Sequence, residues 1–283
     1  MPEQPSRAAA FFDLDRTLIS GASAYTFGVA AWRAKMLPTR QLLGDAAGAL
    51  TFRLAGASDD KTSRVRDRIL GAVQGVAQND LVALNGTVIP TLLEKVRPEA
   101  KTLIEMHRKA GRHTYIVSAS PIEVVDPLAR ALGMTGGIGT RSHVVDGIYT
   151  GEIDGPFVYG EGKSVAIKAL AAETGYDLDR CYSYSDSASD LPMLEAVGHP
   201  VAVNPDSALE AIARRRAWPI VIFHRRTKEW AKRSTAALGA TGLAAASFAG
   251  GLHLGKRRRP APAPAVRLAT RAAAQAAARL GNR

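Results

Sequence analysis

The stretch Ala8–Gly21 reads AAAFFDLDRTLISG, an apolar run that ends in two aspartates, Asp13 and Asp15. In extended backbone, residues two positions apart point to the same side, so both carboxylates are expected to converge. Like charges so close together need a counter-charge, and Mg²⁺, which prefers hard oxygen ligands, is the simplest one. The alternative is a surface turn with two solvated acids, which does not explain why the preceding run is so apolar.

Four further short apolar runs also lead into polar or small residues: HTYIVSAS (113–120), CYSYSDS (181–187), HPVAVN (199–204) and WPIVIF (218–223). Apolar runs without strict alternation are typical of strands that are buried on both faces of a parallel sheet. Helical stretches lie between them, and this alternation predicts an α/β fold with a doubly wound parallel sheet. Ligands of such sheets bind beyond the carboxyl ends of the strands.

The segment between the first and second runs is too long for one crossover helix, and most of it has a helical pattern. It predicts a helical cap over residues 19–97, inserted into a catalytic core formed by residues 8–18 and 98–224. After the second run, β-type residues surround the dipeptide DG, which predicts a β-hairpin at 143–154 near the mouth of the site.

The net charge of +11 is unevenly distributed along the 283 residues. Residues 225–283 form a basic tail with 13 Lys and Arg and one acid, whereas residues 1–224 contain 24 basic and 25 acidic residues. Any partner inferred from charge therefore belongs to the tail. The single cysteine, Cys181, cannot form an internal disulfide and is predicted to be a buried structural thiol. The N-terminus lacks the pattern of a secretory signal, so we expect a cytoplasmic protein.

Within the tail, residues 234–255 lack Asp, Glu, Lys and Arg and are numerous enough to cross a bilayer, although they are rich in Ala and Gly. Basic clusters flank both ends. One interpretation is a helix that associates with an anionic membrane. The other is an Ala-rich helix followed by a disordered basic end. Nucleic-acid binding ranks third, because the tail lacks interleaved aromatic residues.

Three further positions carry groups suited to an anionic substrate. Ser118 ends the second run, where a hydroxyl can bind an anionic oxygen, although serine is also common in ordinary turns. Lys163 opens a helix, where a cation is mildly unfavourable unless an anion pairs with it; a solvated lysine is the alternative. The third run ends in SDSASD, where Asp186 and Asp190 repeat the paired acids of the first run. Together these residues describe a metal-assisted phosphate site.

DLDRT, Ser118, Lys163 and SDSASD match, in this order, the four motifs of the haloacid dehalogenase-like hydrolase superfamily. The sequence YSDSASDLPMLEAVGHPVAVNPDSAL followed by WPI resembles its family IB, which includes the phosphoserine phosphatases. The resemblance covers residues 8–223 and implies a Mg²⁺-dependent phosphomonoesterase that acts on a small phosphorylated substrate. The alternative is a catalytically idle scaffold whose basic tail binds membrane or nucleic acid.

The resemblance also implies a role for each motif residue. Asp13 is the expected nucleophile, and Asp15 is the expected general acid and base. The implied ligands of Mg²⁺ are the carboxylates of Asp13 and Asp186 and the main-chain carbonyl of Asp15.

The remaining motif residues are expected to bind the phosphoryl group. Thr17, Ser118 and Lys163 are the implied contacts of its oxygens, and Asp190 is implied to hold Lys163 or a metal-bound water.

The sequence departs from the phosphoserine phosphatases at two places. Those enzymes carry a glutamate shortly after the first motif, where this chain has Ala22 and Ser23, which leaves the substrate open. Arg16 stands where Gly or Ser is commonest and either points outward or adds positive charge at the mouth of the site. A cap arginine for a substrate carboxylate, or else an exposed charged helix face, is predicted at Arg64, Arg66 and Arg68.

Overall fold

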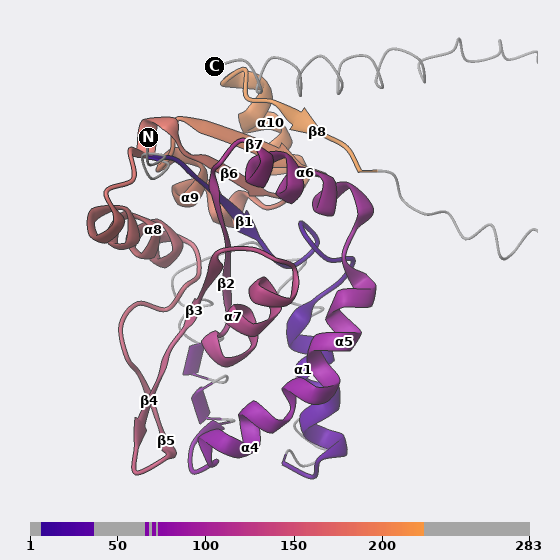
Figure 1. The fold of residues 1–283 in the computed structure, drawn as a ribbon, viewed down its shortest axis with the longest axis vertical. Helices are drawn as coiled ribbons and strands as arrows, with labels where there is room; N and C mark the ends of the chain where they lie inside the picture. The colour runs from indigo at the N-terminus through magenta and orange to yellow at the C-terminus, as the bar shows by residue number, and fades with distance from the viewer. Residues whose placement is uncertain (1–6, 37–65, 68–69, 72, 224–283) are drawn as a thin grey trace, which may run out of the picture. The chain divides into compact units, whose positions relative to one another are not determined.

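The computed structural model describes residues 7–36, 66–67, 70–71 and 73–223 (Figure 1). The chain divides into two units, Met1–Phe223 and His224–Arg283, and all described residues belong to the first. The tail 225–283 with its predicted helix 234–255 therefore lies outside the described residues, as do Arg64 and Arg68.

The sheet consists of β1 (Ala9–Asp13), β2 (His113–Pro121), β3 (Gly136–Thr140), β6 (Tyr182–Ser185), β7 (His199–Val203) and β8 (Ile220–Val221). Within the described chain these strands pair in parallel in the order β3-β2-β1-β6-β7-β8. The chain winds from β1 outward to β3 and then returns to β6 on the other side of β1. The predicted doubly wound α/β fold is confirmed.

The helices are α1 (Ser23–Arg33), α4 (Gln78–Ala83), α5 (Asn85–Lys95), α6 (Pro98–Lys109), α7 (Ile122–Ala131), α8 (Glu161–Thr174), α9 (Leu191–Glu195) and α10 (Ser207–Arg215). Three of their ends show known capping preferences. Pro98 occupies the first turn of α6, and Gly175 ends α8 with a φ of 76°. The Asp206 carboxylate accepts a hydrogen bond from Leu209 N at 2.8 Å and caps α10.

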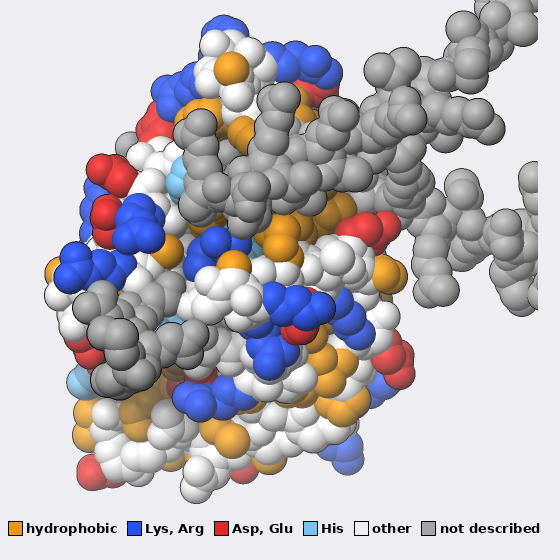
Figure 2. All heavy atoms as spheres, turned by 45° about the horizontal axis from the view of Figure 1, so that its top comes forward, with side chains coloured by type: hydrophobic (Ala, Val, Ile, Leu, Met, Phe, Trp, Pro, Cys, Tyr) orange, Lys and Arg blue, Asp and Glu red, His pale blue; other side chains and the backbone are white. Residues whose placement is uncertain are grey.

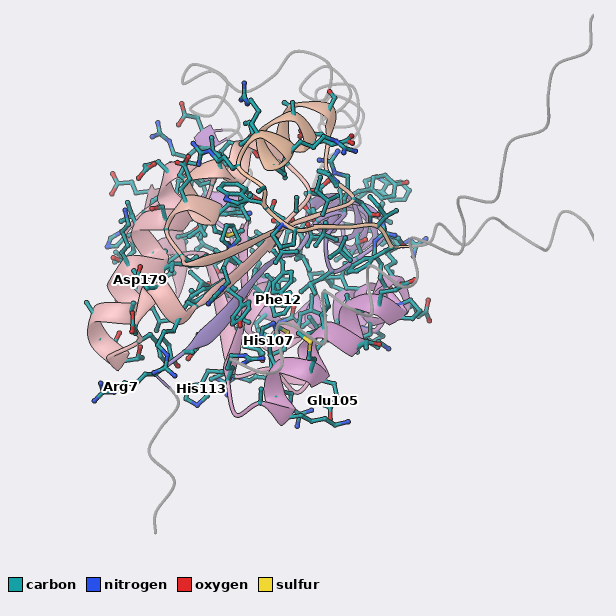
Figure 3. All side chains as sticks on the ribbon, turned by 90° about the horizontal axis from the view of Figure 1, so that it is seen from above. Arg7, Phe12, Glu105, His107, His113 and Asp179 are labelled. Atoms are coloured by element: carbon teal, nitrogen blue, oxygen red, sulfur yellow. The ribbon has the colours of Figure 1, made fainter. Side chains whose placement is uncertain are left out.

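β1 is buried along its whole length because helices cover both faces of the sheet. Phe11 packs into a cluster that includes Ile167 of α8. Phe12 points to the opposite face, where its ring lies edge-on to His107 of α6 at 5.9 Å between centroids (Figure 3). Side chains alternate along a strand, so Asp13 continues the row of Phe11 toward α8.

The sequence patterns do not predict β3 or α7, and the reason lies in the glycines of β3. A Cβ atom at Gly137 would lie 2.7 Å from Asp126 Cα, and one at Gly139 would lie 2.8 Å from Ile122 Cα. Glycine therefore lets the backbone of α7 lie directly on this edge strand, and the same glycines remove the apolar signal of a strand.

The predicted hairpin is present as β4 (Ser142–Val145) and β5 (Ile148–Ile153). Asp146 and Gly147 have φ values of 51° and 79°, as a two-residue turn of this twist requires. Ile148 also forms a bridge with Ala77, so the hairpin is attached to the segment inserted between β1 and β2.

The inserted segment contains α1, α4 and α5, and α1 packs alongside α5 (Figure 1). Ile19 forms an antiparallel bridge with Val96, and Arg97 N donates to Leu18 O at 2.9 Å. The two connections to the insertion are thus hydrogen-bonded to each other. The division into a core (8–18 and 98–224) and a cap (19–97) stays a prediction.

Cys181 is fully buried beside β1, and its sulfur accepts a hydrogen bond from Ala9 N at 3.2 Å. Burial raises the pKa of the thiol. The predicted buried thiol is confirmed.

Candidate active site

The predicted site residues lie at the carboxyl ends of adjacent strands. Asp13 is the last residue of β1, and Asp186 directly follows β6. The winding of the chain reverses between these strands, which is where doubly wound sheets bind ligands. Asp13 pairs with Val117 of β2, so Ser118 lies at the same edge. The prediction that this strand ends at Ser118 is wrong, because β2 continues to Pro121 with a shift in register.

Lys163 lies between two buried carboxylates. Its Nζ donates to Asp13 Oδ1 at 2.6 Å and to Asp190 Oδ2 at 2.8 Å. Burial alone would lower the pKa of Lys163, but the two carboxylates raise it above its ordinary value, so the ammonium stays charged. The anionic partner expected for Lys163 is thus a pair of carboxylates of the chain itself.

Glycines before Lys163 let the chain turn sharply into α8. Gly160 has a φ of 53°, which favours glycine. A Cβ atom at Gly162 would lie 1.8 Å from Phe157 O, so no other residue fits there without movement of the backbone. This turn starts α8 with Lys163 buried.

Asp190 is held by Ser185, a serine of the SDSASD motif to which the sequence analysis assigns no role. Ser185 Oγ donates to Asp190 Oδ2 at 2.6 Å, the same oxygen that accepts from Lys163. Ser185 also accepts a hydrogen bond from Ser187 N at 3.2 Å. The available signal was its position, since it ends β6 immediately before Asp186.

Asp15 reaches the site through a turn and not through extended backbone, because β1 ends at Asp13. Its Oδ1 accepts a hydrogen bond from Ser23 N, at the start of α1, at 2.7 Å. Burial raises the pKa of Asp15, and this hydrogen bond opposes the rise. Ser23 Oγ is 2.8 Å from Ser120 Oγ. Ser23 and Ser120 therefore connect the insertion to the end of β2, a contact that no local pattern predicts.

Arg16 forms an ion pair with Asp186, with Nε 2.8 Å from Oδ2. This decides between the two positions considered from the sequence: Arg16 adds positive charge at the strand ends. Burial raises the pKa of Asp186 to about 6, and Arg16 is the strongest opposing influence.

Two predicted hydroxyl groups are buried at the same edge. Thr17 Oγ1 has no hydrogen-bond partner in the described part of the chain. Ser118 Oγ accepts from Ser120 N at 3.2 Å, and its own proton has no hydrogen-bond acceptor among the described residues. A buried hydroxyl without a partner is costly, so Thr17 is suited to an oxygen of a bound ligand. Arg66, by contrast, pairs with its neighbour Asp67 at 2.9 Å.

The acids of the site fit a divalent cation. Burial raises the pKa of Asp13 to about 8, Lys163 opposes this rise, and the three other acids add to it. Four acids thus face two cations, Lys163 and Arg16, and one divalent ion would balance the remaining negative charge when all four acids are ionised. No three His, Cys, Asp or Glu side chains of the described residues form a ready-made metal cluster. The predicted donors are only two carboxylates and one carbonyl, all hard oxygens that suit Mg²⁺.

Comparison with known proteins identifies the family. The model of the haloacid dehalogenase-like hydrolases matches residues 10–195. The chain belongs to this family. Among hydrolases of this family and their relatives, a probable phosphatase of Mycobacterium tuberculosis is 44% identical over 224 residues, which cover 78% of this chain and 77% of that protein. A phosphoserine phosphatase of the same organism is 38% identical over 246 residues, covering 86% and 80%.

A solved structure similar to this chain comes from Bordetella pertussis Tohama I and is described as a protein of unknown function. It superposes with a TM-score of 0.67 at 29% identity, covering 76% of this chain and 98% of that one. The family assignment agrees with the order of motifs in the sequence.

Proposed function

We propose that this chain is a Mg²⁺-dependent phosphomonoesterase that hydrolyses a small phosphoester through an aspartyl-phosphate on Asp13. The observation that carries the proposal is the buried arrangement of Asp13, Lys163 and Asp190 at the end of β1, with Nζ 2.6 Å from the Asp13 carboxylate. The family membership and the relatives named phosphatases support it. When bound, the divalent cation would draw charge from the phosphoryl oxygens and favour the anion of Asp13.

In the first half of the reaction, the Asp13 carboxylate attacks phosphorus and the bond from phosphorus to the leaving oxygen breaks. A carboxylate repels a phosphate dianion, so neutralisation of charge is the main contribution of the protein. Lys163 supplies a fixed positive charge, and Asp190 with Ser185 holds its ammonium in place. The hydroxyl protons of Thr17 and Ser118 would be donated to the remaining phosphoryl oxygens.

Asp15 is proposed to move the proton in both halves of the reaction. Its raised pKa favours the protonated carboxyl that donates to the leaving alkoxide. The resulting carboxylate then takes a proton from the water that attacks the phosphorus of the aspartyl-phosphate, which releases phosphate and restores Asp13. The hydrogen bond from Ser23 N fixes the position of the Asp15 carboxyl group during both transfers.

Release of phosphate from an aryl phosphate, with and without Mg²⁺, tests this function. We expect turnover that a chelator abolishes and added Mg²⁺ restores. A panel of phosphoserine, amine-free phosphoalcohols and lipid-derived phosphates then addresses the substrate, because the place of the expected cap acid is taken by Ser23, whose hydroxyl lies 2.8 Å from Ser120 Oγ. Absence of phosphate release from every member of the panel would refute the proposal and favour the idle scaffold.

The location of the protein is a separate proposal. None of the helices in the described part of the chain is long and apolar enough to span a membrane. Association with an anionic membrane is proposed only for residues 234–255. Fractionation of the full chain and of a chain that ends at Arg233 tests it, and identical behaviour of both in the soluble fraction would refute it.

A further inference from the structure

Arg16 has an unusual backbone conformation at the centre of the site. Its φ is 63°, in the left-handed region that residues with a side chain rarely adopt. Its N–H donates to Gly21 O at 3.1 Å and closes the loop from Arg16 to Gly21. A glycine would adopt this conformation without strain, so the chain carries a side chain here against the local preference.

That side chain extends to Asp186. Nε lies 2.8 Å from Oδ2, and the Arg16 side chain is 41% exposed while that of Asp186 is 7% exposed. One edge of the guanidinium therefore faces a buried carboxylate, and the rest reaches solvent. An ion pair with one exposed partner can open without leaving a cation buried.

The other acids of the site have different partners. Lys163 binds both Asp13 and Asp190, and Asp15 accepts from Ser23 N. Arg16 is thus the cation that balances Asp186. Under the proposed function, Asp186 is also the carboxylate after β6 that would hold the divalent cation.

We propose that Arg16 is a built-in counter-charge for Asp186 that competes with the divalent cation and so weakens the affinity of the site for it. The inference rests on the proposed role of Asp186. In the metal-free protein the guanidinium stabilises the buried carboxylate. As the cation binds, repulsion between like charges drives the guanidinium toward its solvent-exposed side. The residue thereby determines the Mg²⁺ concentration at which the site fills.

Isothermal titration with Mg²⁺ alone, without substrate and at low ionic strength, tests the competition. Arg16→Gln removes the charge and keeps the length of the side chain, and we expect it to bind Mg²⁺ about tenfold more tightly than the wild type. Arg16→Lys keeps the charge and should stay within about twofold of the wild type. Arg130→Gln is the matched control: it removes one charge from an exposed ion pair on α7 and should leave the affinity unchanged.

Thermal unfolding gives a second readout. The metal-free Arg16→Gln protein should unfold at a lower temperature than the wild type, and saturating Mg²⁺ should raise its unfolding temperature by a larger amount. If the glutamine variant does not fold, Arg16→Gly replaces it, since glycine tolerates the positive φ.

Equal affinity for Mg²⁺ in the wild type and the neutral variants would overturn the inference. Weaker binding in the neutral variants would also overturn it and would show that Arg16 positions Asp186 for the cation. Because no substrate is present, the titration is independent of phosphate release. A wild-type protein that binds Mg²⁺ but releases no phosphate refutes the proposed function alone.

Discussion

The two faces of β1 bury titratable side chains in opposite ways. On the face toward α8, Asp13 lies against Lys163, and the ammonium is held by two carboxylates at 2.6 and 2.8 Å. On the face toward α6, His107 is fully buried beside Phe12, and its ring nitrogens contact Arg112 and Tyr184 and no acid of the described residues (Figure 3). The first face keeps charges inside the protein, and the second keeps a neutral ring.

The hydrogen bonds of His107 explain its neutrality. Arg112 Nε donates to Nδ1 at 2.8 Å, so the proton of the ring is on Nε2, which donates to Tyr184 OH at 2.7 Å. Burial, with a further contribution from Arg112, lowers the pKa of His107 to about 3. An ionised group therefore stays charged in this core only where an opposite charge is buried with it.

The surface of the protein is not divided into a charged side and a neutral side. On the face in Figure 2, basic and acidic side chains stand beside each other at several places. Ion pairs such as Arg130 with Asp126 and Arg214 with Glu210 join residues one helical turn apart. Exposed pairs of this kind contribute little to stability, so the comparison of the two faces concerns buried groups.

The largest expected effect follows from replacing the proposed nucleophile. Asp13→Asn should lower the turnover of an aryl phosphate by at least about 10³-fold, because the amide cannot attack phosphorus. Steady-state kinetics at saturating Mg²⁺ measures it. Asp146→Asn, in the exposed hairpin turn, is the matched control and should keep wild-type turnover. Comparable turnover of Asp13→Asn and the control would remove Asp13 from the chemistry.

The next effect concerns the buried ammonium. Lys163→Met leaves two buried carboxylates without their cation, and we expect the free energy of unfolding to fall by about 3–5 kcal/mol. Urea unfolding of the metal-free protein measures the loss. Lys168→Met, at an exposed position of the same helix, should change it by less than about 0.5 kcal/mol. If Lys163→Met lost as little unfolding free energy as Lys168→Met, the buried ammonium would not stabilise the charged face of β1.

The neutral face predicts a dependence on pH. The pKa of His107 is about 3 in the folded protein and 6.5 as an ordinary histidine, so the unfolded chain binds more protons below pH 6.5. Stability is therefore lost as the pH falls from 6.5 toward 3. Asp13 and Asp186 act in the opposite direction: their raised pKa values of about 8 and 6 make the folded state bind more protons, so their contribution is lost as the pH rises.

His107→Gln isolates the histidine, because the carboxylates of the other face are common to both proteins. Between pH 7 and pH 5 the wild type should lose about 2 kcal/mol of unfolding free energy relative to the variant. Urea unfolding at several pH values provides the measurement, with His143→Gln, on the exposed strand β4, as control. A difference between wild type and His107→Gln that stays constant with pH would show that the pKa of His107 is not lowered in the folded protein.

The smallest expected effect comes from removing one hydrogen bond of His107 on the neutral face of β1. Tyr184→Phe removes the hydroxyl that accepts from His107 Nε2 and should cost about 1–2 kcal/mol. Tyr25→Phe, on an exposed tyrosine of α1, should be nearly neutral in the same urea assay. If Tyr184→Phe lowered the free energy of unfolding as much as Lys163→Met, the neutral hydrogen bond would contribute as much as the buried ion pair. The proposed difference between the two faces of β1 would then be wrong.

The sequence predicted the charged face of β1 better than the neutral face. β1, β2, β6 and β7 follow from short runs rich in apolar and aromatic residues, and the acids at the ends of β1 and β6 follow from their position beyond those runs. β3 could not be predicted, because close contact with α7 and not burial of side chains explains its glycines.

The sequence also could not predict which side chains contact the predicted site residues. Arg16 meets Asp186, and Ser23 meets Asp15 and Ser120, only because the strands bring distant segments together. His107 gives no signal as a lone histidine on a helix, since its neutrality depends on Arg112 and on Tyr184 of β6.

The central claim is that Asp13 is the nucleophile. Its most direct test is to mix the protein with an aryl phosphate and Mg²⁺, quench with acid during turnover, and locate the added mass by tandem mass spectrometry. We predict one phosphoryl group on the Asp13 carboxyl, absent when substrate is omitted. Rapid turnover with no phosphoryl group on Asp13, or with the group on another residue, would contradict the account.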